Sequence, residues 1–377
     1  MSINKEDTPF LFPQTQSTVL PDPSNFFSPN LLSTPLPTNS FFQNFVLKNG
    51  DQPEYIHPYL IKSSNSSLSV SYPFHHFNSA FIYQVFNADL TITSIEQKTN
   101  QSSNEKHIIS SYSDLSVTLD TPSSNLSFFL VRGSPFLTVS VTKPTPLSIS
   151  TIHAILSFTS NENLTKFTFH LNNDQTWILY ASLPIKLSND LSEITSEAFS
   201  GIIRIALYCT AVIKEPFSVE YKFEKKGSGD LLMLTHPLHL QLLSKKDSNV
   251  TVLDDFKYKS IDGDLVGVVG DSWLLKSDPV SVTWHSSKGV KEESHDEIVS
   301  SLLKDVESLK SSPITTASSY FYGKLIARAA RLALIAEEMN YLDTIPTVKK
   351  YLKESIEPWL DGTFNGNGFL YDKKWGG

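Results

Sequence analysis

Acidic side chains at two places stand close enough along the sequence to suggest a catalytic pair. Glu337 and Glu338 are neighbours, and Asp361 and Asp372 flank the turn-rich segment 362–368. Cleavage of a glycosidic bond needs two carboxyl groups, about 6.5–9.5 Å apart for inversion and about 5–5.5 Å for retention. Solvation at a helix end explains the glutamates equally well, and loop capping explains the aspartates. The sequence therefore assigns no catalytic residue in this chain.

Aromatic and polar side chains also gather in the last nine residues. Asp372, Lys374 and Trp375 combine a carboxylate, an ammonium group and a large flat ring. These groups suit a cleft in which the ring stacks on the C–H face of a sugar and the polar groups hold its hydroxyls. The alternative is a buried loop between helices, with Trp375 as a packing residue. Asp372, Lys374 and Trp375 are the candidate substrate-binding residues.

The histidines favour no metal site. His75 and His76 are adjacent, so on a strand their side chains point to opposite faces. His236 and His239 are three residues apart beside a proline, and no third ligand follows at a helpful local spacing. Packing or surface roles are the better interpretation, and we expect no bound metal ion.

Other cofactor motifs fail in the same way. The segment 262–271 begins like a calcium loop, but Val266 occupies its fifth position and no glutamate stands at the twelfth. The single cysteine, Cys209, lies in a mostly apolar run and excludes both a cysteine-based zinc site and an internal disulfide. We expect no cofactor.

The composition of the chain excludes some classes of binding partner. The 377 residues carry 31 basic and 39 acidic side chains, a net charge of -8, with no basic stripe for a nucleic-acid backbone. No run approaches the roughly 20 apolar residues that span a bilayer, and no apolar signal core opens the chain. We expect no nucleic acid and no transmembrane segment, and the sequence itself leaves the localisation unknown.

The elements that must position these residues change type along the chain. Short runs of alternating or β-branched residues, separated by Asn-, Ser-, Pro- and Gly-rich turns, predict an antiparallel β-sandwich over residues 1–240. Mixed signals follow over 241–312, including a helical face through Leu302 and Val306. After Pro313 two amphipathic helices are expected, the second beginning near Asp343. The clearest predicted strands are 68–72, 115–119, 136–141, 167–171, 177–180 and 217–221.

Three stretches then carry a pattern in the same order along nearly the whole chain. They are residues 35–45 followed by His57-Pro58-Tyr59, residues 320–324 (Tyr-Phe-Tyr-Gly-Lys), and residues 371–377 (Tyr-Asp-Lys-Lys-Trp-Gly-Gly). Together they resemble the endo-1,3-β-glucanases of glycoside hydrolase family 81. The likeness is greatest to the plant members, which include the β-glucan elicitor-binding proteins of legumes.

The resemblance implies an N-terminal sandwich (1–240), a small mixed linking domain (241–312) and the truncated start of an (α/α)6 barrel (313–377). It implies inverting hydrolysis of internal bonds in β-1,3-glucan by an Asp acid and a Glu base. The family motifs that hold these carboxylates, Asp-His-His-Tyr-His and a later Glu-rich segment, do not occur in residues 1–377. What carries over is cleft-lining character for Asp372, Lys374 and Trp375. Plant members imply the cell wall or the outer face of the plasma membrane.

Three hypotheses follow. The first is a fragment of an endo-1,3-β-glucanase that is itself inactive, because two helices with open apolar stripes need partners to close a core. The second, from a different class, is a non-hydrolytic β-glucan-binding or elicitor-recognition protein. The third is a truncated chain that aggregates through exposed barrel helices.

Overall fold

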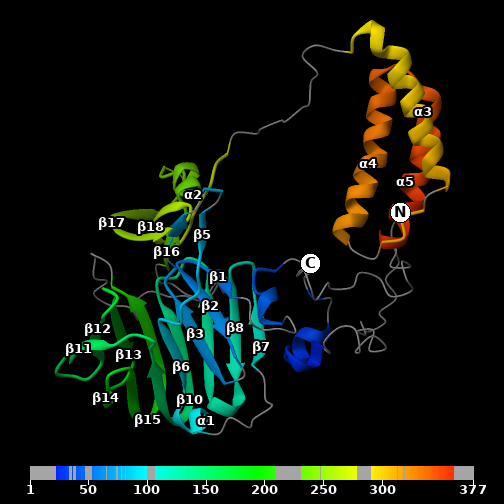
Figure 1. The fold of residues 1–377 in the computed structure, drawn as a ribbon. Coiled ribbons are helices and arrows are strands. Elements are labelled where there is room, and N and C mark those ends of the chain that lie inside the picture. Colours follow the sequence, from blue (N-terminus) through cyan, green and yellow to red (C-terminus); the bar gives the residue numbers. More distant parts are fainter. Residues whose placement is uncertain are drawn as a thin grey trace. The chain divides into compact units, whose positions relative to one another are not determined.

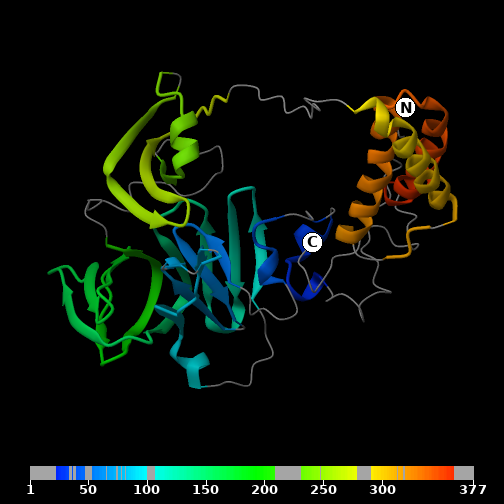
Figure 2. The same cartoon turned by 45° about the horizontal axis from the view of Figure 1, so that its top comes forward.

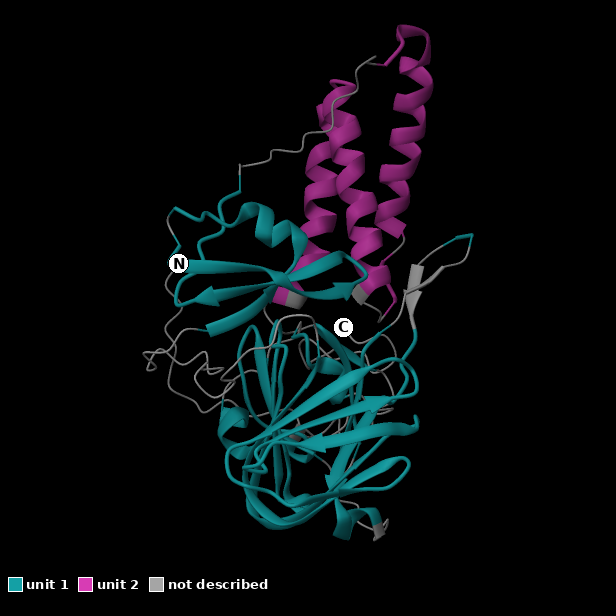
Figure 3. Cartoon of the chain, turned by 90° about the vertical axis from the view of Figure 1, so that its left-hand side faces the viewer, with its two compact units in different colours: residues 1–278 teal, residues 279–377 magenta. Residues whose placement is uncertain are grey.

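The computed structural model describes residues 23–33, 36, 40–46, 53–99, 107–208, 231–277, 290–316 and 319–360, apart from positions 65, 74, 78, 81, 247 and 312. The chain divides into two compact units, residues 1–278 and 279–377 (Figure 3). The first unit is built of β-sheet and the second of helices, so the described residues are mostly antiparallel sheet with a few helices.

Thirteen antiparallel strands, counted among the described residues, form one large sheet in the first unit (Figure 1). The main path through it is β1-β2-β3-β6-β10-β15-β13-β12-β11, while β7, β8 and β9 extend it from β10 and β14 pairs with β15. The strands are β1 (Glu54–Ile56), β2 (Tyr59–Ser63), β3 (Ser67–Ser71), β6 (Leu90–Ser94), β7 (Ile108–Tyr112), β8 (Ser116–Thr121), β9 (Leu126–Val131), β10 (Leu137–Ser150), β11 (Ile155–Ser160), β12 (Lys166–Leu171), β13 (Thr176–Ala181), β14 (Leu187–Asn189) and β15 (Glu193–Leu207).

Two long strands at the centre belong to both halves of this sheet. The first part of β10 pairs with β9 and the last part pairs with β6, while β15 pairs with β10 along nearly its whole length. Register shifts between Val141 and Thr145 and between Pro146 and Ser148 bend the pair between the two parts. Bulges of this kind increase local bending and twist, so one continuous sheet can enclose a core.

The core follows the period-two alternation of the strands. In β8 and β12 every second residue is buried, as a strand with one face toward a core requires. Trp177 is 1% exposed and is among the largest fully buried side chains. Phe26, which follows the first of several short 3-10 turns, and Phe42 and Phe45, at the start and end of another, join the same cluster. The turns are η2 (Pro23–Asn25), η3 (Pro29–Ser33), η4 (Gln43–Phe45) and η5 (Pro122–Ser124).

A smaller sheet of three strands, in the order β16-β18-β17, completes the first unit (Figure 2). Its inward residues, including Leu234, Tyr258 and Leu265, join the core cluster of the large sheet. Its strands are β16 (Leu231–Thr235), β17 (Val250–Ser260) and β18 (Gly263–Gly270), with α2 (Pro237–Leu242) after β16. The hairpin β4 (His75–Phe77) and β5 (Ile82–Gln84) and the short α1 (Ile95–Thr99) lie between strands of the large sheet in sequence.

In the described part of the second unit, three helices pack around their own small core. Leu302 and Val306 of one helix meet Leu332, Ala336 and Val348 of the other two. The elements are η6 (Glu292–Ser294), α3 (His295–Ser311), α4 (Ser319–Glu338), η7 (Leu342–Thr344) and α5 (Ile345–Leu360).

Most predicted elements in the described residues are confirmed. Strands occur at 68–72, 115–119, 136–141, 167–171 and 177–180 to within a few residues, and helices follow Pro313 and Asp343. The predicted strand 217–221 lies outside the described residues. The domain boundaries at 240 and 312 and the barrel stay predictions.

Candidate functional site

The predicted substrate-binding residues lie near the end of the chain. Asp372, Lys374 and Trp375, and with them Asp361, lie in the segment 361–377, outside the described residues. Glu337 and Glu338 are exposed at the end of α4, as solvation requires. The functional groups that the structure does bring together lie in the first unit, where the small sheet meets the end of the large sheet.

One group of charged side chains forms around Glu54 on β1. Asn44 Nδ2 donates to Glu54 Oε2 at 2.9 Å, and Arg132 Nη2 lies 4.0 Å from Glu54 Oε1. The Arg132 guanidinium also stacks over the ring of Phe41, 4.6 Å from its centroid. Phe41 and Asn44 belong to the segment 35–45 that carries the family resemblance. That segment therefore supplies a cap over this carboxyl group.

Burial changes the chemistry of Glu54. Desolvation raises its pKa from 4.5 to about 7, although Arg132 and the Asn44 hydrogen bond both oppose the shift. A carboxyl with such a pKa can hold a proton near neutrality, as a general acid must. Its described partners are an amide and a cation, however, and inverting hydrolysis needs a second carboxyl as the base. The geometry makes Glu54 a buried titrating group in a structural position.

A second group forms from histidines of separate elements. His57, in the two-residue turn between β1 and β2, lies against His236 at the start of α2, with ring centroids 4.4 Å apart. The ring centroid of His239 lies 5.9 Å from that of His236, and His236 Nδ1 is 3.6 Å from Asp262 Oδ2. His236 is partly buried in this contact, and His239 is exposed. In the described residues no group of three or more His, Cys, Asp or Glu has the geometry of a metal site.

The histidines lie in surroundings that favour their neutral form. Burial lowers the pKa of His57 from 6.5 to about 3, helped by His236, Arg132 and His239 and opposed by a backbone hydrogen bond to Leu234. Burial also lowers the pKa of His236, while Asp262 opposes that shift. Both rings are therefore uncharged at neutral pH.

Aromatic residues in the same region are structural. Tyr59 stacks on Trp177 with ring centroids 5.7 Å apart. The rings of Tyr72 and Tyr258 both contact the Tyr59 ring in edge-to-face geometry. The Tyr258 hydroxyl donates to the Leu207 carbonyl at 2.6 Å. Tyr59, Trp177 and Tyr258 are buried, so their faces are not available to stack on a sugar ring.

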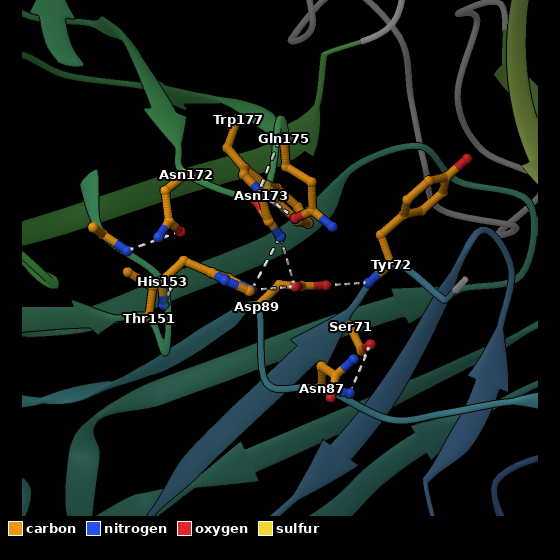
Figure 4. Close-up of polar contacts among 11 residues, drawn as sticks. Ser71, Tyr72, Asn87, Asp89, Thr151, His153, Asn172, Asn173, Gln175 and Trp177 are labelled. Atoms are coloured by element: carbon orange, nitrogen blue, oxygen red, sulfur yellow. Dashed lines mark hydrogen bonds and ion pairs between the residues drawn. The ribbon is translucent and has the colours of Figure 1, made fainter. Parts of the chain in front are cut away.

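A buried aspartate organises the loops on the same side of the large sheet (Figure 4). Asp89 is 2% exposed and accepts a hydrogen bond from the Tyr72 backbone N–H at 2.7 Å. Its other oxygen lies 2.9 Å from His153 Nε2 and 3.4 Å from Asn173 Nδ2. The contacts join four connections between strands. An aspartate–histidine pair suggests catalysis, but the contacts described here hold loops in place.

Two exposed aromatic side chains lie next to one another among the described residues of the second unit. Tyr320 and Phe321 at the start of α4 are 63% and 54% exposed, with ring centroids 5.2 Å apart, and Lys324 lies over the Tyr320 ring. Tyr322 points the other way, is buried and donates to the Ser355 carbonyl. No described helix is long and apolar enough to cross a membrane.

Sequence reasoning missed these arrangements because the partners are far apart. His57 and His236 are separated by 179 positions, and Asp89 and His153 by 64. The sequence contained only a weak signal for these contacts. His57 and Asn44 lie in resemblance motifs, but nothing in the motifs names their partners.

Comparison with known proteins identifies the class. Models of the glycosyl hydrolase family 81 N-terminal domain match residues 22–215 and 209–286, and the model of the family's C-terminal domain matches 289–377. The chain belongs to glycosyl hydrolase family 81, which confirms the resemblance.

Individual relatives agree. A protein of Glycine max named glucan endo-1,3-beta-D-glucosidase is 71% identical over 392 residues, which cover 98% of this chain and 58% of the relative. The structure of a mutant glycoside hydrolase family 81 protein from Clostridium thermocellum matches with a TM-score of 0.67 and 15% identity, covering 94% of this chain and 53% of that one. This second likeness shows the fold alone. The chain thus spans somewhat more than half the length of either relative.

Proposed function

We propose that this chain is the N-terminal part of an endo-1,3-β-glucanase that hydrolyses internal β-1,3-glucosidic bonds. The observation that supports this most is the 71% identity to the Glycine max protein of that name over nearly the whole chain. The substrate is β-1,3-glucan as polysaccharide or oligosaccharide, with the plant cell wall as its source. A role in plant defence belongs to the same proposal.

The catalytic carboxylates of this proposal lie outside residues 1–377. Two largely buried acidic side chains of the first unit have structural partners instead: Glu54 contacts Asn44 and Arg132, and Asp89 accepts a hydrogen bond from a loop backbone. These contacts support the proposal, because they leave neither carboxyl in a catalytic pair. The finer architecture is a β-sandwich, a small linking domain and the first helices of an (α/α)6 barrel. The exposed face of α4 is consistent with further helices packing there. Asp372, Lys374 and Trp375 line the cleft in this proposal and bind the glucan.

Activity is tested on two polypeptides, the 377-residue chain and the complete translation product of its transcript. Inversion at a β-1,3 bond releases the α-anomer first, which proton NMR of a laminarin digest detects before the sugar equilibrates. We expect α-anomer from the complete product and no release from the 377-residue chain. Release of β-anomer, or a transcript whose reading frame stops directly after codon 377, would refute this mechanism.

Binding is tested separately by calorimetry of the 377-residue chain with laminari-oligosaccharides. Loss of one stacking ring corresponds to roughly 1.4 kcal/mol, so Trp375→Ala should weaken binding about tenfold. Asp372→Asn should also weaken binding, and Asp361→Asn serves as its matched control in the same segment. If neither Trp375→Ala nor Asp372→Asn weakens binding relative to the Asp361→Asn control, the assignment of these cleft residues is wrong. If the parent chain gives no heat and no shift in melting temperature, it does not bind glucan.

A further inference from the structure

Besides the apolar core that the two sheets share, the described residues attach the small sheet to the large sheet at two places of different chemistry. At the β17 end the attachment is aromatic and hydroxylic: Tyr258 donates to the Leu207 carbonyl, and the Tyr72 hydroxyl bonds both the N–H and the carbonyl of Lys259. At the β16 end the ring of His57 contacts the ring of His236, beside backbone hydrogen bonds that run through Gly133. Tyrosine hydroxyls do not titrate below pH 8, whereas histidines change charge near pH 6.5. The two attachments therefore respond differently to acid.

Backbone hydrogen bonds hold the histidine end together through one glycine. Gly133 N–H donates to the His57 carbonyl at 3.0 Å, and Leu234 N–H donates to the Gly133 carbonyl at 2.6 Å. Gly133 has a φ of +85°, and a Cβ there would lie 3.1 Å from the Leu234 oxygen and 3.3 Å from His57 Nε2. The close approach of the turn between β1 and β2 to strand β16 thus depends on the absence of a side chain.

The charged groups around His57 come from every element packed against it. Its own hairpin supplies Tyr55 and, further along, Glu54; the turn after β9 supplies Arg132. The segment after β16 supplies the two histidines His236 and His239, and the turn between β17 and β18 supplies Asp262 next to His236. Asp262 is exposed, with 61% of its side chain accessible. Solvent therefore screens the attraction between its carboxylate and the cationic groups near His57. A proton on His57 would face Arg132 and a second imidazole 4.4 Å away.

We propose that the contact between His57 and His236 is an acid-sensitive latch, which holds the β16 end of the small sheet to the large sheet and opens as the pH falls. Opening gives both rings access to water, where they take up protons. The β17 end stays attached through its tyrosines, so the opening is confined to β16 and α2.

The size of the effect follows from proton linkage. The pKa of His57 is about 3 in the closed contact and 6.5 in water. The closed contact is therefore fully favoured above pH 6.5, and each unit below that value, down to about 3, raises the open population about tenfold. At about pH 4.5 the open population is about 100-fold larger than at neutral pH from His57 alone, and protonation of His236 adds to it.

Hydrogen–deuterium exchange of the whole chain measures this opening. After correction for intrinsic exchange rates, amides of residues 231–242 should exchange about 100-fold faster at about pH 4.5 than at about pH 7, while those of 256–260 change little. In the variant carrying His57→Gln and His236→Gln the acid-induced difference should disappear, because neither side chain can acquire a charge. His170→Gln is the matched control, since His170 lies on β12 and contacts Thr176 away from the latch.

The single variant His236→Gln serves the same purpose if the double variant does not fold at neutral pH, since it removes one of the two charges and should reduce the acid effect. Three results would overturn the proposal: equal corrected exchange in 231–242 at both pH values, equal acid acceleration in 231–242 and 256–260, or an undiminished acid effect in the His57 and His236 variants.

Discussion

Replacement of Glu54 by glutamine tests the description of this carboxyl group as a buried acid. Glutamine has the shape of a protonated glutamate and keeps an oxygen that can accept the hydrogen bond from Asn44. The folded protein favours the protonated form of Glu54. Its favourable contribution to stability is therefore complete below pH 4.5 and is lost as the pH rises to about 7.

The expected magnitude comes from the same shift. Moving the pKa from 4.5 to about 7 corresponds to about 3 kcal/mol at pH 8, because each pH unit is worth about 1.4 kcal/mol. The Glu54 side chain is 13% exposed, so solvent screens little of this. The opposing contribution of Arg132, 4.0 Å away, is already part of this net shift of the pKa. Glu54→Gln should therefore stabilise the protein by about 3 kcal/mol at pH 8 and have little effect at about pH 4.5.

Urea denaturation at the two pH values, followed by tryptophan fluorescence, measures this difference. Glu193→Gln is a control of opposite sign, because hydrogen bonds from Lys98 and Ser148 lower the pKa of Glu193. That control should destabilise the protein, and more so at pH 8 than in acid. A Glu54→Gln protein that is less stable than the parent at pH 8 would show that the attraction between the Glu54 carboxylate and Arg132 exceeds the cost of desolvating that carboxylate.

Three further substitutions probe the positions that shape the site, each measured as a change in the free energy of unfolding. Gly133→Ala should cost about 2–3 kcal/mol, because its φ is +85° and the added carbon meets a backbone oxygen at 3.1 Å; a loss below about 0.5 kcal/mol would contradict this crowding. Asp89→Ala should cost about 2–4 kcal/mol, since it leaves the Tyr72 N–H without its acceptor, and a neutral result would mean that water replaces the carboxylate. Tyr258→Phe should cost about 1 kcal/mol through the lost bond to Leu207, and an unchanged stability would show that this hydroxyl does not anchor the small sheet.

Strand positions could be predicted from the sequence wherever one face is buried. The alternation in 167–171 places Phe167, Phe169 and Leu171 inward, and all three are at most 1% exposed. The length of β10 could not be predicted in this way, because Pro144 and Pro146 argue against a central strand. The structure accommodates them at the two register shifts, where ladder hydrogen bonds are already interrupted.

The site was less predictable than the fold for a physical reason. Hydrophobic periodicity reports which way a side chain points, but it does not report which distant side chain it meets. His57 and Arg132 stand in turns, where no periodic pattern exists, and the contact of His57 with His236 depends on the path of the whole first unit. For Asp372, Lys374 and Trp375 the family resemblance remains the sole guide.

The pairing of β10 with β15 has a consequence for synthesis on the ribosome. β10 ends at Ser150 but its partner is not complete until Leu207, so a nascent β10 exposes unpaired backbone while more than fifty further residues are made. Within the large sheet, every strand that precedes β10 in the sequence reaches the later half of the sheet through β10. Pairings this distant in sequence form slowly. A pause in translation before residue 207, or a limited supply of chaperone, should therefore affect the yield of folded protein more than the same disturbance at any later point in the first unit.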